Sequence, residues 1–265
     1  MAVKTTSQLD LLDTFVARGQ NEFTFHDAHQ ALGASVSATA NTLRRLGEKG
    51  LVDKLVRGHY AIRPLGSLGT SAATEDLGLA VGTAFDGYLH RIAYASALSE
   101  LGLLSHPVRI VYVACTKQVR FTKVSRRPLR AIIEQPKTIH LEAEQLGKTR
   151  RSSLERALFE AAMRVDLVGG VERLTEALAA GASDANPARI KRLSKAFGAR
   201  GLAAERRLAS LATALDLPLA LNPQVGKRQP VIRLDPRDCD VVWTDGKYRV
   251  AWNRSMDELR AIVNN

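Results

Sequence analysis

The stretch Ser35–Arg63, which reads SVSATANTLRRLGEKGLVDKLVRGHYAIR, decides the fold that we expect at the start of this chain. It opens on a good N-cap, and apolar residues then recur at helical spacing, so we predict a helix that stops near Gly50. Two runs with strand character follow, Leu51–Val56 and His59–Arg63, joined across an Arg-Gly pair that predicts a hairpin turn. The stretch therefore predicts a helix followed at once by a basic hairpin.

The residues upstream of this stretch predict two shorter helices. Apolar side chains at helical spacing indicate a first helix that Gly19 stops, and Phe23–Phe25 is a short extended piece. Thr24 with Asp27 three residues later is a capping box, and it opens a second helix that ends at Gly33. Helix, short strand, helix, helix and hairpin, in that order, are typical of a winged helix-turn-helix, which we assign to residues 1–66.

A helical wheel separates the third helix into two faces. Ala40, Leu43, Leu46 and Gly47 fall together and should face the other helices. The opposite face could be a merely solvated surface, but its short polar side chains and one arginine suit a DNA major groove, and the hairpin suits phosphate contact. The predicted DNA-binding residues are Ser37, Ala38, Asn41, Thr42 and Arg45 on the helix, and Lys54, Arg57, His59 and Arg63 in the hairpin.

The rest of the chain predicts a second, mixed region, and the fold class as a whole is α+β. Residues 67–78 are rich in Gly, Ser and Thr and indicate a linker. Residues 79–265 should form an α/β domain with a small sheet and a helical bundle, divided near 145–150. We expect helices over 88–101, 153–164, 170–180, 187–197, 202–215 and 255–263, and strands over 108–114, 129–133, 138–141, 231–234, 241–244 and 248–252.

The net charge is the unusual feature of the composition. The chain has 38 Lys and Arg against 27 Asp and Glu, a net charge of +11, which favours a polyanionic partner such as nucleic acid. Residues 1–63 have eight basic and six acidic residues and so contribute only +2. Most of the excess lies in three later clusters. From the first two we predict an auxiliary basic surface of Lys117, Arg120, Lys123, Arg126, Arg127, Arg130, Arg150 and Arg151. The third basic group is Arg189, Lys191, Arg192, Lys195, Arg200, Arg206 and Arg207.

Segments that would direct the chain to a membrane or an oxidising compartment are not evident. No apolar run reaches 18 residues, and the first eight residues lack the apolar core of a signal peptide. Cys115 and Cys239 have neither a CxxC pattern nor a histidine at ligand spacing, so we expect no disulfide and no zinc site. A cytoplasmic protein without membrane contact fits these features.

The sequence contains no convincing enzyme motif, so we expect a protein without catalytic residues, metal or cofactor. P-loop, GxGxxG, HExxH and GxSxG patterns do not occur. The nearest nuclease-like set is Asp238, Asp240, Asp245 and Lys247, because carboxylates and a lysine at strand ends can bind Mg²⁺ and activate water. Asp245-Gly246 between two strands is, however, a strong hairpin signal that explains these residues without chemistry.

Short motifs spread over most of the chain resemble the AbiEi family of antitoxins, which bacterial abortive-infection operons pair with nucleotidyltransferase toxins. They are Arg44-Arg45-Leu46, Gly50-Leu51-Val52, Gly58-His59-Tyr60, Ser96-Ala97-Leu98 with Gly102-Leu103, Leu154 to Leu158 with Gly169-Gly170, and Arg206-Arg207-Leu208. The chain departs from the family pattern at Glu160, where Asp is common, and at Ala209, where Gly is common.

The resemblance implies an autorepressor that binds promoter inverted repeats in double-stranded DNA through its winged module. It also implies that the region after Tyr88 counteracts a nucleotidyltransferase toxin, so the toxin or its RNA target is a further expected partner. Two other functions stay open from the residues alone. One is a metal-dependent DNA-processing nuclease, and the other is a transcription factor whose second domain senses a ligand.

Overall fold

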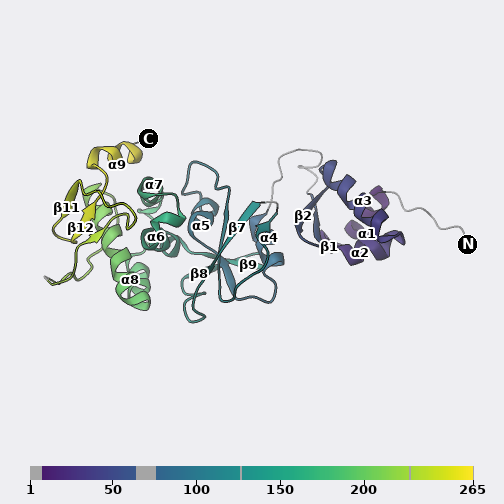
Figure 1. The fold of residues 1–265 in the computed structure, drawn as a ribbon, viewed down its shortest axis with the longest axis horizontal. Helices are drawn as coiled ribbons and strands as arrows, with labels where there is room; N and C mark the ends of the chain where they lie inside the picture. The colour runs from purple at the N-terminus through teal and green to yellow at the C-terminus, as the bar shows by residue number, and fades with distance from the viewer. Residues whose placement is uncertain (1–7, 64–75, 126, 227, 265) are drawn as a thin grey trace, which may run out of the picture. The chain divides into compact units, whose positions relative to one another are not determined.

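The structure is a computed structural model that describes residues 8–63, 76–125, 127–226 and 228–264. It confirms the α+β class (Figure 1). The chain divides into two compact units. The first unit comprises residues 1–86 and 121–128, and the second comprises residues 87–120 and 129–265. The first unit therefore includes two segments beyond the predicted module of residues 1–66, namely 67–86 and 121–128. Most of the predicted linker, residues 67–75, lies outside the described part of the chain.

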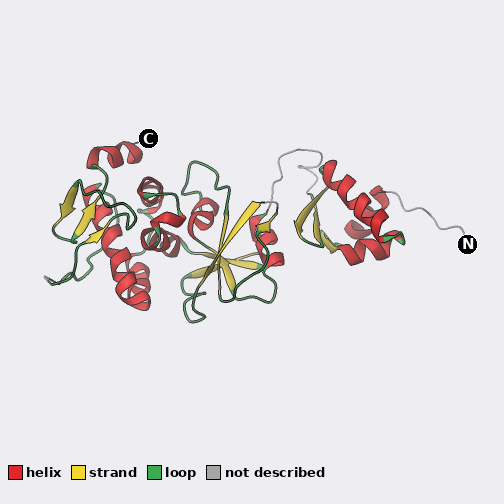
Figure 2. Ribbon diagram, in the orientation of Figure 1, coloured by secondary structure: helices red, strands yellow, loops and turns green. Residues whose placement is uncertain are grey.

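The first unit begins with the element order that its sequence predicted. It contains α1 (Gln8–Ala17), β1 (Glu22–Thr24), α2 (Phe25–Leu32), α3 (Val36–Glu48), β2 (Val52–Val56) and β3 (His59–Ile62). The strands form a small antiparallel sheet in the order β1-β3-β2, and Figure 2 shows it beside the helices. Val52 of β2 joins the apolar core of the helices, whereas Asp53 and Ala61, which pair across the sheet, are buried on its other face.

The core of these helices and strands is apolar and aromatic. Leu11, Phe15, Phe23, Leu43 and Leu46 are buried together, and the rings of Phe15 and Phe23 stack with centroids 4.5 Å apart. The inward face of α3 differs from the predicted one. Thr39 is fully buried where the wheel had placed Ala40, which is exposed.

Two further elements complete the first unit, and neither was predicted. Helix α4 (Leu77–Ala84) begins at the N-cap Asp76, whose carboxylate accepts the N–H of Leu79. Strand β6 (Lys123–Val124) is followed by Ser125, whose N–H donates to the carbonyl of Leu55 at 2.7 Å. Residues far from the N-terminus in sequence thus complete the N-terminal unit.

The second unit opens with a mixed sheet. It contains β4 (His90–Ile92), α5 (Tyr94–Glu100), β5 (Val111–Cys115), β8 (Ala143–Leu146), β9 (Thr149–Ser152) and the part of β7 (Arg127–Ile133) from Leu129 onward. These strands lie in the order β7-β5-β4-β9-β8. The helix expected over 88–101 is shorter because its first residues form β4, and the strand expected over 138–141 is a turn. The β8–β9 hairpin was not predicted, since Glu, Gln and Arg give it no apolar alternation.

A run of helices comes after the last strand of this sheet in the chain. They are α6 (Leu154–Met163), a short 3-10 turn η2 (Val165–Leu167), α7 (Val171–Gly181) and the long α8 (Pro187–Ala214). Helix α8 is broken at Gly198, whose φ of 58° and ψ of −132° are not helical. A left-handed φ is easily adopted by glycine, so the two helices expected over 187–197 and 202–215 are the two halves of α8.

The C-terminal part is a small sheet and a helix. Strands β10 (Ile232–Arg233), β11 (Trp243–Asp245) and β12 (Val250–Trp252) lie in the order β10-β12-β11, and α9 (Met256–Val263) closes the chain from a capping box at Ser255. Strands β11 and β12 pair antiparallel, which confirms the predicted hairpin. In the described residues, none of the helices has the length and apolar character needed to cross a bilayer.

Candidate nucleic-acid interface

Helix α3 presents a short polar face opposite its buried side. Its N-terminus is fixed by Ser35, whose Oγ accepts the N–H of Ala38 at 3.3 Å. Thr39, Leu43 and Leu46 anchor the other side in the core, so the helix cannot rotate without exposing them. Of the DNA-binding residues predicted on this helix, Ser37, Ala38, Asn41 and Arg45 are exposed and Thr42 is half-buried.

Helix α2 holds α3 in place through a capped start and a side-chain contact. Thr24 and Asp27 form the predicted capping box, and the hydrogen bonds from Thr24 hold the pKa of Asp27 below its usual value. The ring Nδ1 of His29 lies 3.3 Å from the hydroxyl of Thr39, which explains why a polar residue is tolerated at that buried position.

Arg44 is also exposed on α3, although it is not among the DNA-binding residues predicted from the sequence. Its guanidinium pairs with Glu48 one turn later at 2.5 Å, and both side chains are 59% exposed. An exposed pair of this kind contributes little stability, so Arg44 can exchange Glu48 for another anion at small cost.

The hairpin of β2 and β3 presents fewer cations than the sequence predicted. Lys54 and Arg57 are exposed and His59 is half-buried. Arg63 is 6% exposed, and its guanidinium makes a two-point ion pair with Asp53, with N–O distances of 2.9 and 2.8 Å. The expected phosphate contact by Arg63 is therefore corrected to a structural role, because Asp53 already occupies its donors in the interior.

The auxiliary basic residues are divided between the two units. Lys123 and Arg127 belong to the first unit, Arg126 lies outside the described residues, and the remaining ones belong to the second unit. The exposed ones are Lys117, Arg120, Lys123 and Arg130. Arg127 and Arg150 are half-buried, as is Arg151, which pairs with Glu144 at 3.2 Å and donates to the carbonyl of Glu100.

Most side chains of the third basic group, on α8, are buried or already paired with a carboxylate, so few of them are available to a polyanion. Arg206 and Arg207 are 3% and 7% exposed, and their guanidinium groups donate to backbone carbonyls, including those of Tyr248 and Ala162. Arg189 and Arg192 both pair with Glu142, at 2.5 and 2.7 Å. The exposed cations that remain on this helix are Lys191, Lys195 and Arg200.

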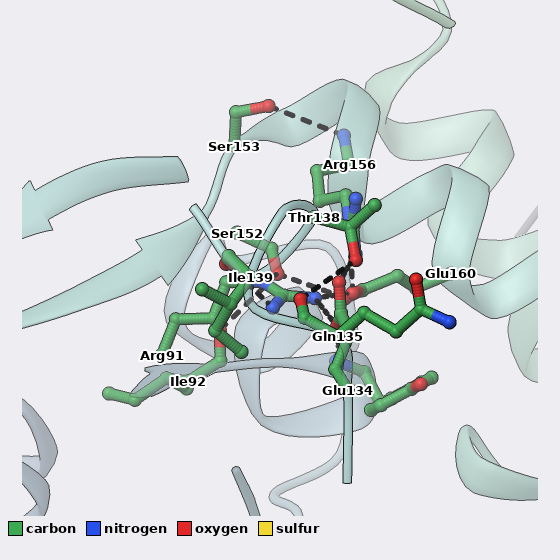
Figure 3. Close-up of polar contacts among 11 residues, drawn as sticks. Arg91, Ile92, Glu134, Gln135, Thr138, Ile139, Ser152, Ser153, Arg156 and Glu160 are labelled. Atoms are coloured by element: carbon green, nitrogen blue, oxygen red, sulfur yellow. Dashed lines mark hydrogen bonds and ion pairs between the residues drawn. The ribbon is translucent and has the colours of Figure 1, made fainter. Parts of the chain in front are cut away.

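A buried ion network joins the sheet of the second unit to α6 (Figure 3). Glu134 accepts from Arg91 at 2.9 Å and from Arg156 at 2.6 Å, and Glu160 accepts from the same two arginines. Burial alone would raise the pKa of Glu160, but the two guanidinium groups hold it below its usual value. Two cations thus balance two carboxylates, which lets the network lie in the interior.

The nuclease-like residues do not assemble into a metal site. Asp238 pairs with Arg254 at 2.9 Å, and Asp245 accepts from the Ser210 hydroxyl at 2.6 Å and from the N–H of Tyr248 at 3.1 Å. These contacts are those of a hairpin turn and a surface ion pair. Within the described residues, no group of three or more His, Cys, Asp or Glu side chains could hold a metal ion.

Comparison with known proteins identifies a fold but no family. No protein-family model matches the chain, and no curated protein does. The chain is similar in structure to the RV2827C protein from Mycobacterium tuberculosis, whose crystal structure is known, with a TM-score of 0.68 and 20% sequence identity over 96% of this chain and 94% of that one. At that identity the likeness shows a shared fold and nothing about function.

Proposed function

We propose that this protein is a DNA-binding transcriptional repressor whose first unit is a winged helix-turn-helix. The observation that carries the proposal is α3, which is capped at its start, anchored by three buried side chains and exposes Asn41 and Arg45 on its outer face. Asn pairs with adenine and Arg with guanine through two hydrogen bonds in the major groove. The exposed Lys54 and Arg57 of the hairpin supply phosphate contacts beside it.

The test is binding to the DNA upstream of the protein's own gene. At a fixed, near-physiological salt concentration, the protein should bind that DNA about 1,000-fold or more tightly than a scrambled duplex of equal length and composition. Fluorescence anisotropy with labelled duplexes measures both affinities. Equal affinity for the two duplexes would show a general polyanion binder instead of a repressor of its own operon.

We further propose that the second unit counteracts a nucleotidyltransferase toxin. This rests on the resemblance of the sequence motifs to AbiEi antitoxins, of which Leu154 to Leu158 open α6 and Arg206-Arg207-Leu208 lie on α8. Their arginines are buried contacts that hold the unit together, so the motifs describe its fold more than a toxin-binding surface. A nucleotidyltransferase gene beside this one is the observation that separates an antitoxin from a plain transcription factor.

A further inference from the structure

A cavity of about 560 Å³ opens in the second unit, within the range of small-molecule sites. Its walls come from the start of α5, the end of β7 with the turn after it, the end of α6, and α8 on both sides of the Gly198 break. The apolar part of the wall is Ile132, Ile133, Met163 and Phe197. A cavity of this volume can hold a ligand larger than an inorganic ion, and its apolar wall can contact the apolar part of that ligand.

The charges around this cavity are unbalanced in favour of cations. Lys137, Arg164, Arg200 and Arg207 line it, against the single carboxylate of Glu134. That carboxylate is already neutralised, because each of its oxygens accepts from a buried guanidinium, of Arg91 or of Arg156. Arg164 is balanced by Asp166 at 2.8 Å. In the described chain, Lys137, Arg200 and Arg207 have no carboxylate within ion-pair distance.

Arg207 is the cation that most needs an anion. It is 7% exposed, and it donates through Nε to the carbonyl of Arg233 at 2.8 Å and through Nη1 to that of Ala162 at 2.9 Å. Burial lowers the pKa of its guanidinium to about 10, although Asp235 acts in the opposite direction. Carbonyl dipoles satisfy its hydrogen bonds without cancelling its charge, which leaves a buried positive charge facing the cavity.

The aromatic wall has a further cation behind it. The guanidinium of Arg156 lies over the ring of Phe197 with its carbon 4.6 Å from the centroid, and its Nη1 is buried without a hydrogen-bond partner. The charge of Arg156 is balanced by Glu134 and Glu160, so the positive charge that a ligand against Phe197 would meet comes from Lys137, Arg200 and Arg207. We propose that this cavity is a binding site for a small organic anion, with the anionic group on Arg200 and Arg207 and the apolar body against Ile132, Met163 and Phe197.

The experiment uses the full-length protein and a matched pair of fluorescent probes. Anilinonaphthalene sulfonate has an aromatic body and a sulfonate, and phenylnaphthylamine has the same body without the charge. We expect one sulfonate probe to bind per chain, at least about tenfold more tightly than the neutral probe. Arg200→Gln should weaken the sulfonate probe about tenfold, because it removes a charge-assisted contact.

Lys195→Gln is the matched control, since Lys195 is exposed on the same helix and does not line the cavity. It should leave the affinity of the sulfonate probe unchanged, and both variants should melt at the parent temperature. Equal affinities for the charged and neutral probes would overturn the proposal and indicate an apolar patch only. Equal weakening by Arg200→Gln and Lys195→Gln would also overturn it, because the effect would then follow net charge and not this cavity.

Discussion

Arg63 shows how a single ion pair decides what a basic side chain can do. In the sequence it stands in a basic hairpin and was expected to contact phosphate, but in the structure it is buried in an ion pair with Asp53 of the neighbouring strand β2. The periodicity of residues 51–63 indicated two strands, yet it could not indicate that an acid and a base share one inward face. Thr39 is a similar case, since its burial depends on the nearby His29 of another helix. Side-chain partners from other elements are what the sequence alone could not supply.

The first prediction concerns this pair. Arg63→Ala leaves Asp53 buried without its partner and should lower the free energy of unfolding by about 3–5 kcal/mol. Arg57→Ala in the same hairpin removes an exposed guanidinium and should change it by less than about 0.5 kcal/mol. Urea denaturation of the two variants checks the contrast, and a loss below about 1 kcal/mol for Arg63→Ala would place Arg63 on the surface after all.

Elements with strong local signals were predicted well, and those that depend on distant partners were not. Capping at Thr24 and Ser35 and the turn at Gly58 located α2, α3 and the hairpin. Strand β4 was predicted as helix because three residues, His90–Ile92, become a strand only by pairing with β5 and β9. Helix α4 overlaps the end of the predicted linker at residues 77–78, and the sequence predicted no element for its remaining residues, 79–84. The candidate face of α3 was therefore predictable, whereas the cavity of the second unit was not, because its residues come from four separate segments.

The hairpin of β11 and β12 carries the second prediction. Asp245→Asn keeps an oxygen for the N–H of Tyr248 and an amide for the hydroxyl of Ser210, so the turn should persist. DNA affinity should stay within about twofold of the parent, and the melting temperature within a few degrees. A magnesium-dependent nuclease activity that is present in the parent and lost in this variant would revive the nuclease hypothesis.

The whole molecule carries its charge unevenly. Residues 1–63 contribute +2 from eight basic and six acidic residues, out of a total of +11. Part of the remainder is internal, since Arg91, Arg156, Arg206 and Arg207 are buried. A count of basic residues in the sequence therefore overstated the surface available to a polyanion. Among the auxiliary residues of the second unit, Lys117, Arg120 and Arg130 are exposed.

The third prediction tests whether those three residues contact DNA. Changing Lys117, Arg120 and Arg130 to Gln should flatten the slope of log affinity against log salt by about 2–3, because each lost phosphate contact removes a slope near −0.9. The preference for upstream over scrambled DNA should not change. A control triple variant of the exposed Lys191, Lys195 and Arg228 should keep the parent slope. Identical slopes for the two triple variants would exclude the Lys117, Arg120 and Arg130 surface from the DNA complex.

The claim that α3 reads DNA is tested most directly by the double variant Asn41→Ala/Arg45→Ala. Each side chain should contribute about 1–3 kcal/mol of specific binding, so anisotropy at constant salt should show at least about a thirtyfold loss for upstream DNA. Arg18→Ala/Gln20→Ala removes the same two kinds of exposed group after α1 and should bind like the parent. Upstream-DNA affinity that is the same for the Asn41/Arg45 variant and the parent would contradict the account.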